Sequence, residues 1–167
     1  MDESILLHIL ILTVLLILSA FFSACEAAFF SLTSIQLKEL KETKGRWGLV
    51  ANNLIEKPRE LLITIYIGNE LVNISVSVIT TSIFITTFGN IGVGIAIGVG
   101  TFLLLVFGEI IPKTLSLQFP QTYAVVAAYP LKLFASIVQP IQLLLTSLAE
   151  KFISFIGGFS SILKIIL

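Results

Sequence analysis

Glu109 is the residue whose type and setting most clearly indicate chemistry. It lies near the end of an apolar stretch at 101–117, within Gly-Glu-Ile-Ile-Pro-Lys. A carboxylate is costly in hydrocarbon, so such residues usually face the interior of a helix bundle or a water-filled cavity. Pro112 has no backbone N–H and frees a carbonyl one turn back, while Gly108 permits another segment to approach closely. A buried acid beside an interrupted helix predicts a cation site.

Two further apolar stretches carry a carboxylate at a comparable depth. Glu26 lies 21 residues after position 5, Glu109 lies 18 residues after position 91, and Glu70 lies 18 residues before position 88. At a rise of about 1.5 Å per residue, all three fall in the same third of the bilayer. Ser23 and Asn69 fall at that level too. We therefore predict one layer of polar groups from three helices, which forms either a cation site or a structural hydrogen-bond network.

The donors in this layer are hard oxygens from carboxylate, amide, hydroxyl and backbone carbonyl groups. Such oxygens suit Mg²⁺, Ca²⁺ or Na⁺. The sequence has one cysteine and one histidine, which serve zinc or copper poorly. We interpret Cys25 as a packing residue and His8 as a packing or surface residue. Because no Ser/His/Asp set lies at this depth, we do not expect an enzyme.

Three predicted membrane-spanning helices must position these groups, at 5–31, 61–88 and 91–117. Each exceeds the 20 or so residues needed to cross hydrocarbon. The chain of 167 residues is 56% hydrophobic and 12% charged, whereas soluble domains are about 25% charged. Its formal net charge is zero, so nothing indicates nucleic-acid binding. The composition therefore predicts an all-α membrane protein that contacts the lipid bilayer.

The segment 32–59 is the predicted soluble connection between the first two spans. It is rich in lysine and arginine, so the positive-inside rule places it in the cytoplasm and the N-terminus outside. Apolar residues recur at helical spacing around Gly45 and Gly48, which predicts two short amphipathic helices. A tight external turn is expected at 88–90.

The C-terminal segment is punctuated by Pro120, Pro130 and Pro140. We expect broken helices along the cytoplasmic interface, because no 18-residue apolar stretch there lacks a proline or a polar residue. A fourth membrane-spanning helix is the alternative. In the third span, Gly94 and Gly98 have the small-xxx-small spacing that favours close helix contact, either within the chain or across a dimer.

Three stretches together resemble the transmembrane domain of the CNNM/CorC family of magnesium transporters. They are SAFFSACEAAFFS at 19–31, IGNELVN at 67–73 and GEIIPK at 108–113. Each is modest alone, but their order and spacing are specific. The resemblance implies three membrane-spanning helices, cytoplasmic connecting helices and a belt-like juxtamembrane helical segment, all within 1–156. It also implies that 157–167 starts a linker to CBS-pair domains absent from this chain.

The resemblance further implies a homodimer in the cell membrane, with the C-terminus in the cytoplasm, that exports Mg²⁺ in exchange for Na⁺. Carried over by motif, the cation ligands are Ser23, Ser31, Asn69 and Glu109, helped by backbone carbonyls near Ser23 and Gly68. The alternatives are a membrane-embedded Mg²⁺ sensor that anchors cytoplasmic domains, and a cation channel.

Glu26, Glu70 and Asn73 lie in or beside the same layer. They either join these ligands or form structural hydrogen bonds only.

The spacing of Ser23 and Ser31 predicts a distortion of the first helix. Eight residues turn through about 800° in a regular helix, which leaves the two side chains about 80° apart. One looped-out residue, as in a π-bulge, would cut this offset to about 20° and release a carbonyl, and π-bulges are frequent at functional sites. Ser19, one turn nearer the outside, is expected to contribute little.

Overall fold

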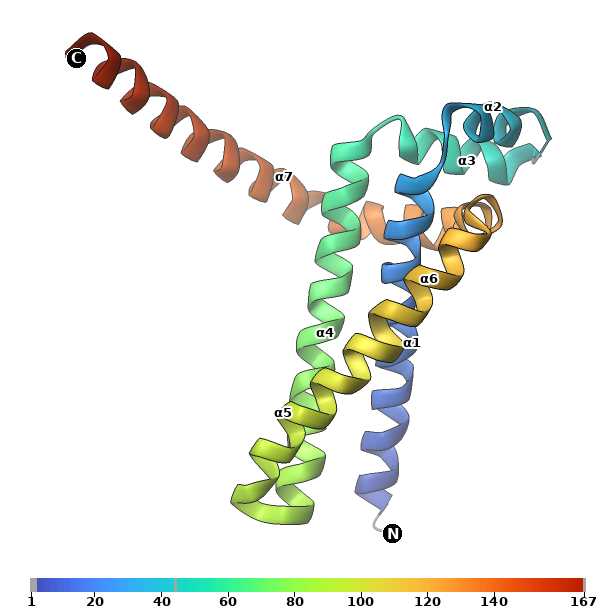
Figure 1. The fold of residues 1–167 in the computed structure, drawn as a ribbon, viewed down its shortest axis with the longest axis vertical. Coiled ribbons are helices and arrows are strands. Elements are labelled where there is room, and N and C mark those ends of the chain that lie inside the picture. The colour runs from blue at the N-terminus through green and yellow to red at the C-terminus, as the bar shows by residue number, and fades with distance from the viewer. Residues whose placement is uncertain (1–2, 44, 167) are drawn as a thin grey trace.

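The computed structural model describes residues 3–43 and 45–166, and all the elements in this part of the chain are helices. Three rods form the bundle. The first is α1 (Glu3–Ser31), the second is α4 (Pro58–Phe88), and the third joins α5 (Gly92–Leu103), the π-helical η2 (Leu104–Ile110) and α6 (Ile111–Gln118). The N-terminus and the α4–α5 turn lie at one end of this bundle, and the remaining helices lie at the other (Figure 1).

Within the described chain, three stretches are long and apolar enough to cross a membrane, namely Ile5–Ser31, Pro58–Gln118 and Pro120–Leu148. The second contains α4 and the third rod, which run in opposite directions on either side of η1 (Gly89–Ile91) (Figure 1). The predicted external turn is therefore confirmed as a turn. The chain is an all-α, multi-pass membrane protein.

The connection between the first two rods forms two short helices, as predicted. These are α2 (Ser34–Thr43) and α3 (Gly45–Ile55). A capping box starts α2, because the Thr33 backbone N–H donates to Gln36 Oε1 at 2.9 Å and the Gln36 N–H donates to Thr33 Oγ1 at 3.4 Å. These two helices cover one end of the bundle.

Lys41 ties α2 to the end of α3 by an ion pair with Glu56, at 3.1 Å between Nζ and Oε1. Asn52 Nδ2 donates to the same carboxylate oxygen at 2.7 Å. The hydrogen bond from Lys41, followed by that from Asn52, lowers the pKa of the Glu56 carboxyl below its usual value. Lys41 and Glu56 are exposed, whereas Asn52 is buried, so we assign the ion pair a modest stabilising role.

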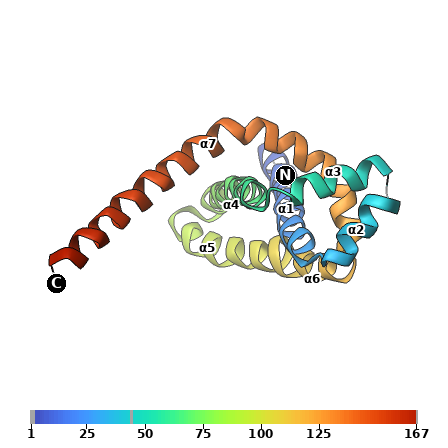
Figure 2. The same cartoon turned by 90° about the horizontal axis from the view of Figure 1, so that it is seen from above.

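The expectation of broken helices after Pro120 is wrong. One continuous helix, α7 (Pro120–Ile166), contains Pro130 and Pro140 in its interior. It crosses the end of the bundle and curves around it before its C-terminal half projects away (Figure 2). Proline removes one backbone hydrogen bond without necessarily ending a helix, and packing here holds the curved helix, since Leu131 and Val138 are buried. The helix passes position 156 without a break, and the linker assignment of 157–167 stays a prediction.

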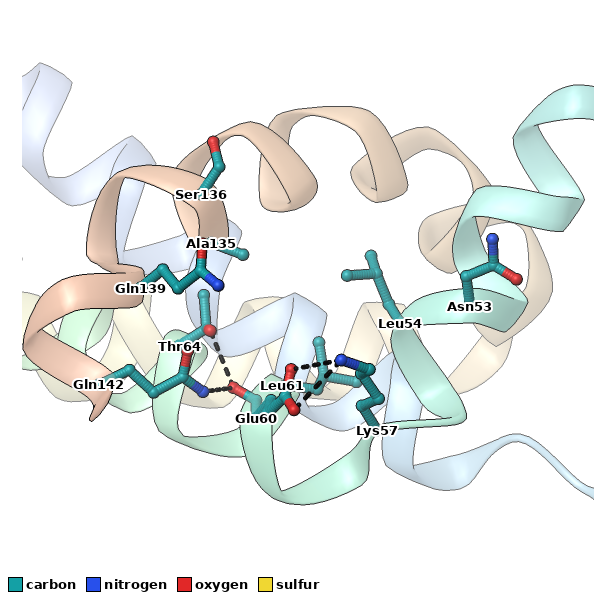
Figure 3. Close-up of a pocket in the computed structure, with 10 residues that line it drawn as sticks. All are labelled: Asn53, Leu54, Lys57, Glu60, Leu61, Thr64, Ala135, Ser136, Gln139 and Gln142. Carbon is teal, nitrogen blue, oxygen red and sulfur yellow. Dashed lines mark hydrogen bonds and ion pairs between the residues drawn. The ribbon is translucent and has the colours of Figure 1, made fainter. Parts of the chain in front are cut away.

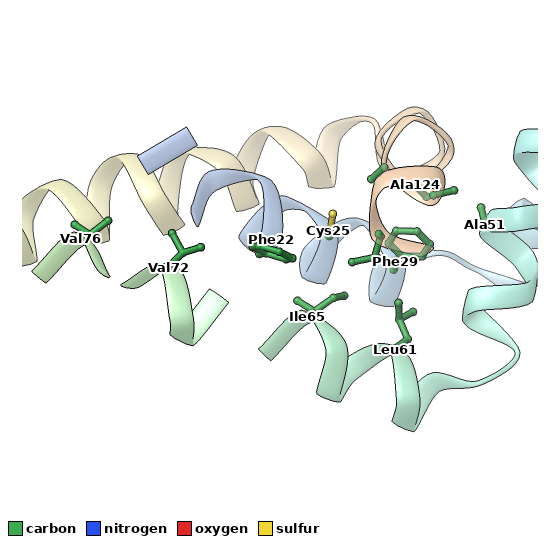
Figure 4. Close-up of a cluster of buried hydrophobic side chains, with 12 residues drawn as sticks. Phe22, Cys25, Phe29, Ala51, Leu61, Ile65, Val72, Val76 and Ala124 are labelled. Carbon is green, nitrogen blue, oxygen red and sulfur yellow. The ribbon is translucent and has the colours of Figure 1, made fainter. Parts of the chain in front are cut away.

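A buried apolar cluster joins α7 to α1 and α4 (Figure 4). Phe22, Cys25 and Phe29 of α1 pack with Ile65 of α4 and Ala124 of α7, among other buried residues. The tilted contact between the Phe22 and Phe134 rings, at 5.0 Å between centroids, adds a further link to α7. The middle of α1 is therefore held from two sides by apolar contacts.

The glycines of α5 have two different settings. A Cβ at Gly92 would collide with the backbone carbonyl of Phe84, and a Cβ at Gly100 would lie 3.4 Å from Thr80 Cγ2. Gly94 and Gly98 instead have nothing within 4 Å of a Cβ in the described chain. The small-xxx-small pair therefore faces away from the chain's own helices, and the intrachain explanation for it is wrong.

We predict that Gly92→Ala destabilises the protein by about 1–3 kcal/mol, because the added methyl group must push α5 away from α4. Gly100→Ala is the matched control, since its methyl group would lie at an ordinary van der Waals distance of 3.4 Å from Thr80 Cγ2, and it should change the stability little. Thermal unfolding in detergent compares the two. Equal unfolding temperatures for the two variants would contradict the tight α4–α5 contact.

Candidate cation site

Two contacts fix the alignment of α1 with α4. Ser19 Oγ donates a hydrogen bond to Asn73 Oδ1 at 2.8 Å. Gly68 lies so close to the Phe22 ring that a Cβ would collide with it. The two helices run antiparallel (Figure 1). Ser23, one turn after Ser19, and Asn69, one turn before Asn73, therefore lie at one level.

Ser23 and Asn69 each have a buried oxygen without a hydrogen-bond partner in the described chain. These atoms are Ser23 Oγ and Asn69 Oδ1. Leaving a buried polar group unpaired costs about 1–3 kcal/mol, and buried side-chain polar atoms are bonded in the large majority of cases. Two such oxygens at one level on neighbouring helices are therefore free to bind a further group.

The third rod brings Glu109 to the same region. A Cβ at Gly108 would lie 2.7 Å from Ser19 Oγ, so the chain packs directly against α1 at the residue before Glu109. Glu109 itself is partly buried. The predicted role of Gly108 as a point of close approach is confirmed, and the segment that approaches is α1.

The helix around Glu109 is π-helical rather than α-helical. At its end the Ile111 N–H donates to the carbonyl of Val106, five residues back. The next donor would come from Pro112, which has no N–H, so the carbonyl of Phe107 or Gly108 receives no bond from that position. A widened helix that ends at a proline thus leaves a backbone oxygen available beside Glu109.

The predicted distortion of α1 between Ser23 and Ser31 is wrong. α1 is an α-helix through Ser31, and the π-helical segment lies in the third rod instead. Ser31 Oγ donates to the carbonyl of Ala28 at 3.0 Å, and eight residues place it about 12 Å along the axis from Ser23. The structure therefore brings Ser23, Asn69 and Gly68 together and leaves Ser31 apart from them.

The three carboxylates do not gather into one cluster. Glu26 Oε2 pairs with Lys113 Nζ at 3.1 Å, and Glu70 is exposed. No group of three or more acidic, histidine or cysteine side chains in the described residues could hold a metal ion. The expected layer is thus built from neutral oxygens and Glu109, while Glu26 is neutralised by a lysine on α6.

Ser19 has a packing role between three helices whose partners the sequence did not predict. It is completely buried, and it contacts both α4 and the third rod through Asn73 and Gly108. Ser19 lies one helical turn from Ser23, and Asn73 lies one turn from Asn69. This spacing indicated that each pair shares a face of its helix, but it did not predict which residues bond across the helices.

A second polar pocket lies away from this layer, between the start of α4 and α7 (Figure 3). Gln142 Nε2 donates to the carbonyl of Glu60 at 2.7 Å, and Thr64 Oγ1 donates to the same oxygen at 2.8 Å. Lys57 pairs with the Glu60 carboxylate at 3.2 Å. The hydrogen bond from Gln142 to the Glu60 carbonyl therefore tethers α7 to α4.

Comparison with known families settles the relationship that the three stretches suggest. The model of the Cyclin M transmembrane N-terminal domain (CNNM) matches residues 10–164. The chain belongs to the CNNM family. The CNNM domain therefore accounts for nearly the whole of this chain, including α7.

Curated relatives of this CNNM domain are similar over most of its length. It is 36% identical to a UPF0053 protein of Haemophilus influenzae over 148 residues, which cover 89% of this chain and 35% of that protein. It is 32% identical to a UPF0053 inner membrane protein of Escherichia coli, covering 84% of this chain and 33% of that protein. A chloroplastic DUF21 domain-containing protein of Arabidopsis thaliana is 34% identical, with 89% and 22% covered. The chain spans about a third or less of these relatives.

We predict that Lys113→Met destabilises the domain by about 1–3 kcal/mol, because it leaves the Glu26 carboxylate partly buried without its countercharge. The side chains of Glu26 and Lys113 are 24% and 38% exposed. The double variant Glu26→Gln/Lys113→Met should recover part of the loss.

Lys57→Met is the matched control, since its pair with Glu60 is 67% and 60% exposed and should contribute little. Thermal unfolding in detergent reports all of these changes. An equal loss of stability in Lys57→Met and Lys113→Met would show that the ion pair between α1 and α6 stabilises the domain no more than an exposed pair does.

Proposed function

We propose that this CNNM domain transports Mg²⁺ across the membrane, in exchange for Na⁺. The observation that carries the proposal is the pair of unpartnered buried oxygens, Ser23 Oγ and Asn69 Oδ1, next to the π-helical segment that bears Glu109. Hydroxyl, amide, carboxylate and carbonyl oxygens are the ligands that hard cations take. A bound cation would satisfy both unpartnered oxygens at once.

The proposed ligands are Ser23, Asn69 and Glu109, with backbone carbonyls at Gly68 and at Phe107 or Gly108. Mg²⁺ gives up its water reluctantly, so the anionic carboxylate supplies the main electrostatic attraction in this apolar setting. Ser31 could join them only if α1 rearranged, so it lies outside the ligand set proposed for this conformation.

Sodium fits the same proposal as the exchanged ion. Na⁺ is also a hard cation that takes oxygen ligands, and one carboxylate neutralises it fully, whereas Mg²⁺ retains one positive charge. Competition of the two ions for one layer would couple their movements. An exchanger of this kind binds the two ions alternately at one site and changes its conformation between the two events.

The second candidate function is a Mg²⁺ sensor that anchors further domains in the membrane. It is favoured by the length of the curated relatives, of which this chain spans about a third or less. Liposomes containing this chain alone separate the candidates, because a transporter moves Mg²⁺ and a sensor only binds it.

We also propose that the domain forms a homodimer through the free face of α5, where Gly94 and Gly98 meet no other part of the described chain. Small residues let helix backbones approach closely in a membrane. The proposed location is the cell membrane.

We predict that Glu109→Gln lowers Mg²⁺ affinity at least about 100-fold and abolishes flux, because the amide keeps the shape of the side chain but removes its charge. Asn69→Ala and Ser23→Ala should weaken binding about tenfold, since each removes one neutral oxygen. Glu70→Gln is the matched control, since that side chain is exposed, and should bind normally.

Isothermal titration with Mg²⁺ measures affinity, and a fluorescent Mg²⁺ indicator inside liposomes measures flux. Normal binding and flux in Glu109→Gln, together with their loss in Glu26→Gln, would show that the wrong carboxylate has been assigned.

The topology that we propose places the α4–α5 turn outside the cell and α2 and α3 in the cytoplasm. In a Cys25→Ala background, Asn90→Cys should react with an impermeant thiol reagent added to intact cells, whereas Glu42→Cys should react only after the membrane is opened. Both positions are exposed, so accessibility within the protein does not distinguish them. The reverse pattern of labelling would invert the orientation.

A further inference from the structure

We propose that Ser19, Asn73 and Gly108 form a seal that closes the cation site toward the end of the bundle that holds the N-terminus and η1. The inference rests on the proposed function, because it assigns positioning residues to the same site. According to this proposal, the ion leaves the site toward η1 only when the hydrogen bond between Ser19 and Asn73 opens.

All three residues are displaced from the proposed ligands in one direction. Ser19 precedes Ser23 by four residues on α1, and Asn73 follows Asn69 by four residues on the antiparallel α4. Gly108 precedes Glu109 on the third rod, which runs away from η1. Each displacement points toward η1, and the residues contact one another through Ser19. They therefore cap the site as a group.

The seal leaves no space for a hydrated ion. Ser19 is 0% exposed, and even a methyl group at position 108 would lie within 2.7 Å of its Oγ. The next turn of α4 toward η1 presents Val76, which is also 0% exposed and belongs to the apolar core. An ion moving from the site toward η1 would meet a closed layer of polar contacts and then an apolar one.

The side of the site that faces away from η1 is polar and partly exposed. One turn beyond Ser23 lies Glu26, whose ion pair with Lys113 is partly exposed, and Lys113 follows Glu109 by four residues on the rod that runs away from η1. A partly exposed ion pair permits water to approach from that side. The structure therefore has one closed face and one polar face, as expected of a single state of an alternating-access cycle.

A neutral hydrogen bond suits a contact that must open and re-form. It is weaker than a charge-assisted bond, and both partners can be hydrated when they separate. Asn73 accepts from Ser19 through Oδ1, so loss of either side chain removes the same bond. The two residues should therefore behave as one unit in a double-variant test.

The test measures water access just beyond the seal, by a thiol introduced with Val76→Cys in a Cys25→Ala background. The protein is placed in nanodiscs and treated with a charged methanethiosulfonate reagent. Labelling should be slow when the seal is intact, because position 76 is buried. Ser19→Ala and Asn73→Ala should each raise the labelling rate at least about tenfold, and the double variant should not exceed the faster single variant. Ser77→Ala is the matched control, because its exposed hydroxyl bonds only the carbonyl of Asn73.

Mg²⁺ titration of the same proteins separates the seal from the ligands. Ser19→Ala should change the dissociation constant less than about threefold, since it keeps Ser23, Asn69 and Glu109. Unchanged labelling in folded Ser19→Ala and Asn73→Ala proteins would overturn the seal even if Mg²⁺ binds. Absence of Mg²⁺ binding in the parent protein would overturn the proposed function, and the labelling rates would still decide the seal. Thermal unfolding verifies folding, and Ser19→Ala, which removes one oxygen atom, decides the result if Asn73→Ala does not fold.

Discussion

Unpaired oxygens in an apolar layer are the constraint on which this structure depends. Hydrocarbon offers no water to a buried hydroxyl or amide, so polar groups within a membrane bundle normally bond one another. Ser19 and Asn73 obey this rule, and Glu26 and Lys113 obey it with opposite charges. Between these two bonded pairs, the oxygens of Ser23 and Asn69 have no hydrogen-bond partner among the described residues.

The surrounding packing holds these two oxygens in place. The contact between Phe22 and Gly68 fixes the register of α1 against α4, and the apolar cluster around Phe22 extends to α7 (Figure 4). The third rod changes to a π-helix as it reaches this level, and Pro112 ends the widened segment. The apolar packing of α1, α4 and α7 and the π-helical segment η2 thus both lie beside Ser23 and Asn69.

Much of this arrangement follows from the sequence, because hydropathy and charge act locally. The apolar lengths predicted the three rods, the basic connection predicted α2 and α3, and counting along the spans predicted one polar level for Ser23 and Asn69. The stretch around Glu109 indicated an interrupted helix, since Gly108 and Pro112 bracket it.

The remaining features depend on contacts that no local rule describes. Pro130 and Pro140 suggested helix breaks, but tertiary packing keeps α7 continuous. The distortion inferred between Ser23 and Ser31 lies on the third rod instead, because only the assembled bundle decides which helix widens. Rotation about each axis likewise decides that Glu26 meets Lys113 and that Glu70 faces outward.

The central claim is that a hard cation fills the layer between α1, α4 and the third rod. Mn²⁺ accepts the same oxygen ligands as Mg²⁺, and its anomalous scattering locates it directly. A crystal structure of this protein with Mn²⁺ should show an anomalous peak between Ser23, Asn69 and Glu109, which excess Mg²⁺ removes. A structure in which that position holds no ion, and in which Ser23 and Asn69 bond each other or other protein atoms, would contradict the account.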